Sequence, residues 1–313
     1  MAASSPIEPA PMHHLLVPLD GSALAEAALP AAIRLGRALP ARVTLLHVME
    51  RGAPATVHGH AHLDDAAEAA AYLTGVEARF AEASVTAEVH VHPNPEGDVA
   101  ASIAEHAAEF GADLIVLCAH GEGGVSGWWS GAMAQQVIRR VAPPVLLVRP
   151  RPDGSAPPFA PAAALVALDG GGEGEAALPP ALTLAQALNA QLVLAVVVPT
   201  VGALPGDRAA TAIFVPSATA AALDLEEDAA AAYLDGLADR LRAGGAAVRT
   251  VVARGDVVRR MATLAEEIGP NILALATHGR AGLDAFWSGS VGSRVVAKAS
   301  GPLLLVHPPR RRG

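Results

Sequence analysis

The stretch "GDVAASIAEHAAEFGADLIVLCAHG", from Gly97 to Gly121, occurs a second time as "GDVVRRMATLAEEIGPNILALATHG", from Gly255 to Gly279. In each copy a segment with helical spacing of apolar residues leads into a short apolar run that is typical of a buried strand. A helix that feeds directly into a buried strand is characteristic of α/β folds with parallel strands. The stretch therefore indicates the fold class, and its repetition indicates two domains.

Three further pairs of segments repeat in the same order along the chain. They are "LLVPLDGS" from Leu15 with "ALVALDGG" from Ala164, "AAAYLTG" from Ala69 with "AAAYLDG" from Ala230, and "PPVLLVRP" from Pro143 with "GPLLLVHP" from Gly301. Four landmarks in one order indicate an internal duplication. A Pro-rich stretch lies between the copies and is typical of a stiff linker. We predict a first domain over residues 1–152, a linker over 153–163 and a second domain over 164–313.

Within each copy, apolar runs alternate with segments of helical period. The first copy has five such runs, "HLLVPLD", "RVTLLHVM", "AEVHVH", "DLIVLCAH" and "PVLLVR", with helical patterns between them. This alternation predicts parallel strands, right-handed crossovers and helices on both faces of a sheet. We therefore expect two tandem doubly wound α/β domains, each with a five-stranded parallel sheet.

Composition and charge exclude several classes of function. The 313-residue chain has a formal net charge of -9 and no basic stripe, which argues against a nucleic-acid partner. No apolar run approaches the ~20 residues that cross a bilayer, and the N-terminus has no signal-peptide pattern, so no membrane partner is expected. Cys118 is the only cysteine, which excludes an intrachain disulfide and fits a reducing compartment. We predict a cytoplasmic protein.

The motifs at the strand ends resemble those of the universal stress protein family in its tandem form. The family pattern after the fourth strand is Gly-x-x-Gly, nine residues, then Gly-Ser or Gly-Thr. The second copy reads Ala276-x-x-Gly279, nine residues, Gly289-Ser290. The family also places an aspartate at the end of its first strand, where this chain has Asp169. The resemblance covers nearly the whole chain.

The first copy matches the same pattern less well. It reads Cys118-x-x-Gly121, nine residues, Gly131-Ala132, although Asp20 matches the first-strand aspartate. For both copies the resemblance implies a strand order of 3-2-1-4-5 and a stress-response role, with ATP as the ligand at the point where the strand order reverses. Whether Mg²⁺ accompanies the nucleotide is left open.

The second copy carries the favoured nucleotide site. Glycines let backbone N–H groups approach phosphates, the first N–H groups of a helix attract anions, and Arg280 adds positive charge. Asp169 can accept hydrogen bonds from ribose hydroxyls or an adenine edge, beside the backbone at the end of the second strand. The alternative is that these glycines only form turns and Ser290 only caps a helix. The candidate binding residues are Asp169, Val197, Gly279, Arg280, Gly289, Ser290 and Val291.

The first copy is the weaker candidate. Ala132 lacks the hydroxyl of Ser290, Cys118 is larger than the family's glycine, and Glu122 replaces the positive charge of Arg280. A like charge near a phosphate weakens binding. The corresponding candidates are Asp20, Val48, Gly121 and Gly131.

Three classes of function remain at this point: an ATP-binding regulator, a structural or adaptor protein of the same fold that binds no nucleotide, and an ATP-using enzyme. No Walker motif and no nucleophile–base arrangement is present, so we predict no catalytic residues and at most slow ATP hydrolysis. No metal site is predicted, although the sequence does not decide whether the His58-His60-His62 stretch binds metal. We expect a homo-oligomer, with a dimer as the simplest form; the sequence identifies no protein partner.

Two further expectations concern the fold. The apolar last strands "VLLV" and "LLLV", which begin at Val145 and Leu303, are expected to pair with one another, because each would otherwise leave an apolar edge exposed. The connection from Pro199 to Asp228 is about twelve residues longer than its counterpart and is expected to be a lid or an unstructured segment.

Overall fold

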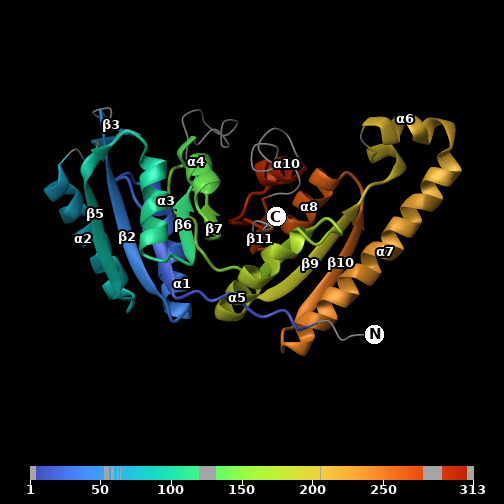
Figure 1. Cartoon of the computed structure of the whole chain (residues 1–313), viewed down its shortest axis with the longest axis horizontal. Helices are drawn as coiled ribbons and strands as arrows, with labels where there is room; N and C mark the ends of the chain where they lie inside the picture. Colours follow the sequence, from blue (N-terminus) through green and yellow to red (C-terminus); the bar gives the residue numbers. More distant parts are fainter. Residues whose placement is uncertain are drawn as a thin grey trace. The chain divides into compact units, whose positions relative to one another are not determined.

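A computed structural model describes residues 5–52, 56–57, 60–61, 63, 65–119, 132–204, 206–277 and 291–308 (Figure 1). The chain divides into two compact units. The first unit consists of Pro11–Ala160 with Pro302–Leu305, and the second unit consists of Met1–Ala10, Pro161–Gly301 and Val306–Gly313. The domain boundaries expected from the sequence, at 152 and 164, remain predictions.

The first repeat runs from β1 to β7 and alternates strands with helices. Its elements are β1 (His14–Pro18), η1 (Ala25–Ala28), α1 (Leu29–Ala38), β2 (Arg42–Glu50), β3 (Thr56–Val57), β4 (His60–Ala61), α2 (Ala66–Glu82), β5 (Ala87–Glu96), α3 (Val99–Glu109), β6 (Leu114–Cys118), α4 (Ala132–Arg140) and β7 (Val145–Val148). Asp65 and Asp98 cap α2 and α3 with their carboxylates, while Pro30 lies in the first turn of α1, where a proline is tolerated.

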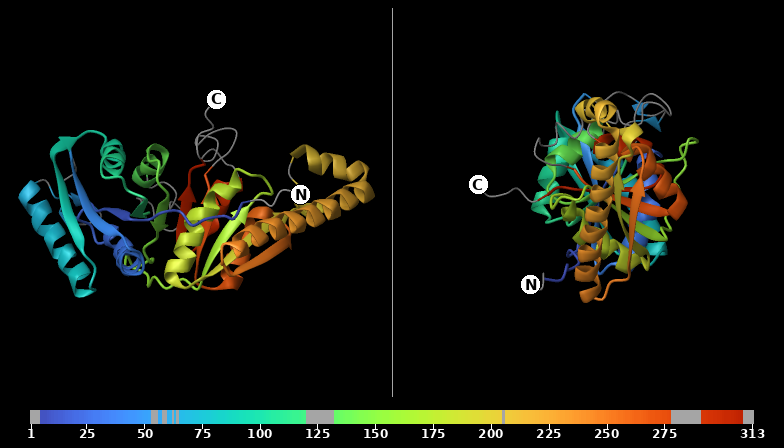
Figure 2. Two further views of the ribbon diagram at one scale, coloured as in Figure 1. Left: turned by 60° about the horizontal axis from the view of Figure 1, so that its bottom comes forward. Right: turned by 90° about the vertical axis from the view of Figure 1, so that its right-hand side faces the viewer.

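The sheet of the first repeat has the order β5-β2-β1-β6-β7, with parallel pairing of all five strands. Numbered within the repeat, this is the expected order 3-2-1-4-5. Helices cover both faces of the sheet, with α1 and α2 on one side and α3 and α4 on the other (Figure 2). β1, which pairs on both sides, is buried along its whole length. A parallel sheet covered on both faces requires such apolar strands.

The second repeat runs from β8 to β12 and has the same plan. Its elements are β8 (Ala163–Leu168), η4 (Gly174–Ala177), α5 (Leu178–Leu188), β9 (Gln191–Val198), η5 (Val201–Ala203), α6 (Gly206–Phe214), α7 (Pro216–Ala243), β10 (Val248–Arg254), α8 (Val257–Ile268), β11 (Asn271–Ala276), α10 (Val291–Lys298) and β12 (Leu303–Val306). Asp256 caps α8 as Asp98 caps α3, so the shared "GDV" of the two copies has the same structural role.

In the second repeat, β8 pairs in parallel with β9 and β11, and β9 pairs in parallel with β10. β12, the last strand of the repeat, pairs antiparallel with β7, with Leu304 opposite Leu146. The expected pairing of the two last strands is therefore confirmed. Because of this pairing, residues Leu303–Leu305 of β12 belong to the first compact unit, together with β7.

The long connection after β9 is not an unstructured segment, one of the two expected alternatives. It forms α6 and the first half of the 28-residue α7 (Figure 1), and the alternative that it acts as a lid remains a prediction. Its sequence "SATAAALDLEEDAAAAYL" is rich in alanine, leucine and glutamate, the strongest helix formers, so propensity alone could have indicated the helix.

Histidines in the first repeat contribute a pH dependence to its stability. Buried His14 contacts the Phe110 carbonyl and Thr44 Oγ1, and the rings of His90 and His92 each lie 5.0 Å from the ring of His106. Desolvation lowers the pKa of His14 below 6.5; desolvation and then the neighbouring His106 lower that of His90. In the unfolded chain, His14 and His90 therefore bind protons at a pH where they remain neutral in the folded chain.

We predict that the contribution of His14 and His90 to the free energy of unfolding of the first repeat is fully present well above pH 6.5, the ordinary pKa of histidine, and is lost as the pH is lowered through that value. Urea denaturation between pH 7.5 and 5, followed by hydrogen exchange in peptides from β1, β5 and α3, measures this dependence. The variant His14→Gln with His90→Gln should show a shallower decrease, and an equally steep decrease would contradict the assignment.

Candidate functional site

The carboxyl ends of three neighbouring strands meet at one level in the second repeat. The register pairs Leu168 with Val196 and Val166 with Ala274, so Asp169 is level with Val197 on β9 and with Thr277 after β11. Thr277 is held there by its N–H and its hydroxyl, which donate to the Val306 carbonyl at 2.8 and 3.2 Å. The sequence-predicted residues Asp169 and Val197 thus lie level with each other and with Thr277, at the carboxyl ends of adjacent strands.

The first repeat has the equivalent arrangement. Pro18 pairs with Leu46 and Leu16 with Ile115, so Asp20 is level with Val48 and with Ala119 after β6. The thiol of Cys118 is buried, and burial followed by the negative charge of Asp20 raises its pKa. The thiol therefore remains protonated and unreactive at neutral pH.

The chain leaves the central strand of each repeat through the same aspartate turn. Asp20 Oδ1 accepts from the Ser22 N–H at 2.8 Å, and Asp169 Oδ1 accepts from the Gly171 N–H at 2.9 Å. The intervening glycine has a positive φ in both turns, +87° at Gly21 and +81° in the second. Only glycine adopts this conformation without strain, so the Asp-Gly pair is a structural requirement of the turn.

After the aspartate, the two turns are stabilised differently. In the first repeat, Ser22 is buried and its Oγ accepts from the Ala25 N–H at 3.1 Å. The second repeat has Gly171 at the equivalent position, which provides no such side chain. Its carbonyl instead accepts from the Tyr233 hydroxyl of α7 at 3.3 Å. Asp169 is exposed, whereas Asp20 is half-buried.

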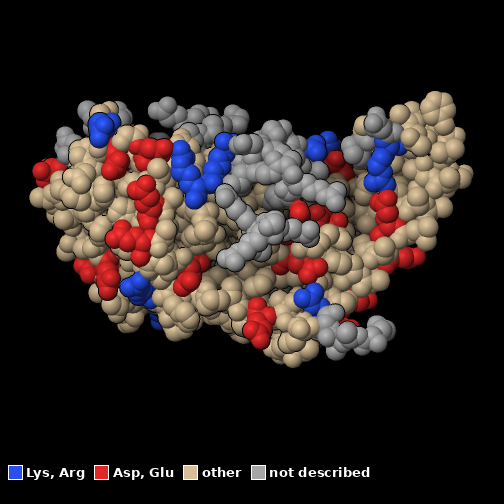
Figure 3. Space-filling view, viewed as in Figure 1, with Lys and Arg blue, Asp and Glu red and all other residues tan. Residues whose placement is uncertain are grey.

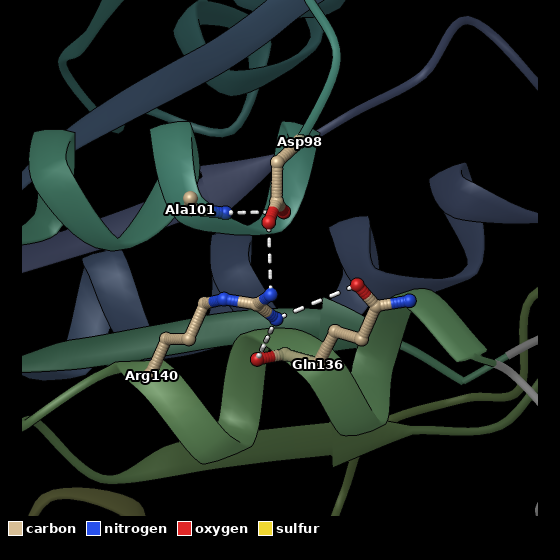
Figure 4. A network of polar contacts seen from close by, with 4 residues as sticks. All are labelled: Asp98, Ala101, Gln136 and Arg140. Atoms are coloured by element: carbon tan, nitrogen blue, oxygen red, sulfur yellow. Dashed lines mark hydrogen bonds and ion pairs between the residues drawn. The ribbon is translucent and has the colours of Figure 1, made fainter.

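Helix α4, which follows the glycine-rich stretch of the first repeat, is fixed against the preceding helix, α3. In the first repeat, Arg140 at the end of α4 contacts Asp98 Oδ2 of α3 at 2.8 Å and donates to the carbonyl and the side chain of Gln136 (Figure 4). Asp98 also accepts from the Ala101 N–H, so one carboxylate caps α3 and orients α4. In the second repeat, α10 begins at Val291, the last of the predicted phosphate-proximal residues.

Several predicted site residues lie outside the described residues. They are Gly121 and Gly131 of the first repeat and Gly279, Arg280, Gly289 and Ser290 of the second. Their roles remain predictions, as does the contrast between Glu122 and Arg280. No group of three or more histidine, cysteine or acidic side chains suited to a metal ion occurs among the residues that the structure describes, which do not include His58 and His62.

Sequence reasoning missed a polar group beside each aspartate turn. Arg79 pairs with Glu26 in the first repeat at 2.5 Å, and Arg240 pairs with Glu175 in the second at 3.1 Å. Each arginine lies seven residues after a tyrosine, Tyr72 or Tyr233, on the same face of its helix. The sequence did contain an indication of this group, since Tyr72 and Tyr233 are the only two tyrosines of the chain and occupy matching positions in the two copies.

The model of the universal stress protein family matches residues 12–149 and again residues 163–307. The universal stress protein YxiE of Bacillus subtilis is 31% identical over 147 residues, which cover 43% of this chain and 97% of that protein. A universal stress protein structure from Archaeoglobus fulgidus is 17% identical and covers 95% of this chain and 97% of its own, with a TM-score of 0.66.

A putative universal stress protein from Pseudomonas aeruginosa is 16% identical and covers 95% of this chain and 94% of its own, with a TM-score of 0.64. The two repeats, each with an aspartate turn after its first strand, correspond to the two segments that the family model matches. The chain therefore belongs to the universal stress protein family, in its tandem form. Within the described ranges, no helix is both long enough and apolar enough to cross a membrane.

The aspartate turns generate a stability prediction. Gly170→Ala should destabilise the second repeat by about 1–2 kcal/mol, because an L side chain resists the positive φ although the space beside it is open. Gly21→Ala should cost more, since its Cβ would also lie 2.6 Å from Leu63 Cδ1. Denaturant unfolding measures both. Gly172→Ala, at an open position without a positive φ, is the control and should be neutral or slightly stabilising. Equal stabilities of the Gly170 and Gly172 variants would show that the turn is not constrained.

Proposed function

We propose that this protein is a nucleotide-binding stress-response regulatory protein that binds ATP mainly through its second repeat. The observation that supports this most directly is the exposed Asp169, level with Val197 and with Thr277 at the carboxyl ends of neighbouring strands. Ligands of open α/β sheets bind at the carboxyl ends of strands, where the strand order reverses. β8 and β11 are the strands between which that reversal occurs.

Asp169 has the chemistry to hold the nucleoside. One of its oxygens accepts the Gly171 N–H, and a carboxylate offers about four lone-pair sites, so it can also accept from ribose hydroxyls. In the proposed complex, the backbone at Val197 faces the adenine. The backbone and side chains of Gly279, Arg280, Gly289 and Ser290 contact the phosphates, together with the first N–H groups of α10, which begins at Val291.

The first repeat is proposed to be the weaker site. Asp20 and Val48 occupy the equivalent places, but Ala132 provides no hydroxyl and Glu122 replaces Arg280. In addition, the buried Cys118 thiol stands where the family pattern has glycine, and it lies close enough to Asp20 for the carboxylate to influence its pKa. Gly121 and Gly131 retain only backbone contacts for a phosphate.

The remaining proposals concern the ligand and the setting. ATP binds with or without Mg²⁺, and its role is regulatory. We expect at most slow hydrolysis, because the sequence motifs do not place a nucleophile beside a general base. On the face in Figure 3, the basic side chains lie among acidic ones, which does not favour a nucleic-acid partner. We propose a cytoplasmic homo-oligomer with a reduced Cys118.

Mass spectrometry of the ligand released from freshly purified protein, followed by calorimetric titration with ATP, tests the proposal. Asp169→Ala should weaken ATP binding about 10- to 100-fold, since a hydrogen bond to a charged group contributes ~1.5–3 kcal/mol. The matched control Asp20→Ala should leave the dominant site unchanged. Loss of binding in Asp20→Ala alone would instead assign the site to the first repeat. No binding by the unaltered protein would support the adaptor alternative.

A second pair of variants tests the phosphate end. Ser290→Ala with Arg280→Glu should lower ATP affinity by about one to three decades, from a lost hydroxyl contact and a reversed charge. The reciprocal change, Ala132→Ser with Glu122→Arg, should improve binding by the first repeat. Calorimetric titration again provides the measurement. Unchanged affinity in the first variant would refute the assignment of these residues.

A further inference from the structure

The loop after Asp169 is rich in glycine. Its sequence "DGGGEGE", Asp169 to Glu175, contains four glycines, and glycine loses more conformational entropy on ordering than any other residue. The equivalent "DGSALAE" of the first repeat has one glycine and is fixed by the Ser22 hydroxyl. Beyond the hydrogen bond between Asp169 and Gly171 and the turn of η4, partners from elsewhere in the chain therefore add to the order of the second loop.

Two side chains of α7 supply such partners. The Tyr233 hydroxyl lies 3.3 Å from the Gly171 carbonyl and 3.4 Å from Glu175 Oε1. Burial, followed by the charges of Glu175 and Asp169, raises the pKa of Tyr233, so its hydroxyl remains a donor at neutral pH. Arg240 Nη1 donates to Glu175 Oε2 at 3.1 Å, with both side chains about two-thirds buried. The single hydroxyl proton of Tyr233 is shared between the Gly171 carbonyl and Glu175, and Arg240 binds the other oxygen of Glu175, so the loop is joined to α7 at Gly171 and at Glu175.

Arg240 is in turn held by the N-terminal segment, which we define as residues 5–10. Its Nε donates to the Ser5 carbonyl at 3.2 Å, and the Ile7 N–H donates to the Arg240 carbonyl at 3.4 Å. The Ile7 side chain is buried. In this way one arginine joins the N-terminal segment to Glu175.

The end of the same segment is fixed to α5. The Ala10 N–H donates to the Pro179 carbonyl at 3.2 Å, and the Thr183 hydroxyl donates to the Ala10 carbonyl at 2.7 Å. The segment thus contacts α5 and α7 of the second repeat, although it precedes the first strand in the sequence (Figure 2). It also precedes residue 12, where the first match to the family begins.

The first repeat provides a comparison within the same chain. Arg79 pairs with Glu26 as Arg240 pairs with Glu175. The Tyr72 hydroxyl likewise lies beside Glu26, and burial, followed by the charge of Glu26, raises the pKa of Tyr72. However, no hydrogen bond joins the Tyr72 hydroxyl to the backbone of the described loop residues, and the loop is fixed by Ser22. The second repeat has glycine in place of this serine, and it has the contact of Tyr233 with the Gly171 carbonyl and the N-terminal segment.

We propose that residues 5–10, acting through Arg240, Glu175 and Tyr233, form a positioning element that orders the loop from Asp169 to Glu175. The consequence for ATP rests on the function proposed above: an ordered loop presents the Asp169 carboxylate to the ligand without a further loss of entropy on binding. Tyr233, Glu175 and Arg240 are positioning residues, because they act on the loop and not on the nucleotide.

Hydrogen–deuterium exchange of the full-length protein tests the element without relying on ATP. Deletion of residues 2–10 should raise backbone exchange in a peptide spanning 169–177 about tenfold or more, as expected for the loss of hydrogen bonds that hold it. Exchange in a peptide spanning 20–28, the equivalent loop of the first repeat, should be unchanged. ATP affinity should fall about tenfold.

Full-length variants keep the test decisive if the deletion does not fold. Arg240→Met should raise exchange in 169–177, and Arg240→Lys should restore it in part, because lysine retains a charge for Glu175 but lacks the fork that also reaches Ser5. Arg79→Met is the matched control and should not affect 169–177.

Unchanged exchange in 169–177 for folded Arg240→Met would overturn the proposal, as would an equal rise in 169–177 and 20–28, which would indicate general destabilisation. If the unaltered protein binds no ATP but exchange responds as expected, the positioning element stands and the nucleotide function fails. If ATP binds with normal affinity to a variant whose loop exchanges faster, the loop is ordered by this element but does not position Asp169, and the inference about binding is wrong.

Discussion

The central strand of each repeat imposes the constraint on which the rest of the site depends. β1 is buried along its length and pairs on both sides, and β8 has the same place between β9 and β11. A strand in this position cannot end gradually, because its polar backbone must leave an apolar layer covered by helices. The Asp-Gly turn solves this problem: the carboxylate accepts a backbone N–H, and glycine permits the reversal of direction.

The same turn brings polar chemistry to the edge of the sheet. Because parallel strands end at a common edge, the aspartate is necessarily level with the ends of its two neighbours, Val197 and Thr277 in the second repeat. The Asp169 carboxylate is therefore needed both for the hydrogen bond of the turn and for the proposed contact with the ligand. Asp169 can serve both only because one oxygen suffices for the turn, and because Tyr233 and Arg240 stabilise the residues that follow.

The sequence predicted the parts of the molecule that depend on local patterns. Apolar runs identified the strands, and the duplication identified the two repeats. The group of Tyr233, Glu175 and Arg240 was not predicted, since its members come from segments that repeat at different spacings, 149 residues for Glu26 and Glu175 and 161 residues for Arg79 and Arg240. The N-terminal segment "SPIEP" has no periodicity that points to a partner, and its contacts with α5 and α7 arise only in three dimensions.

The two repeats show how a duplicated turn can diverge without losing its fold. Gly171 lacks the hydroxyl that Ser22 provides in the first repeat and adds conformational freedom, both of which favour a disordered loop. The N-terminal segment offsets this cost at a distance, because its backbone carbonyls accept hydrogen bonds from the Arg240 and Thr183 side chains. Such an arrangement makes the order of the Asp169 loop depend on a segment that belongs to no strand or helix. A loop stabilised from within, as at Ser22, has no such dependence.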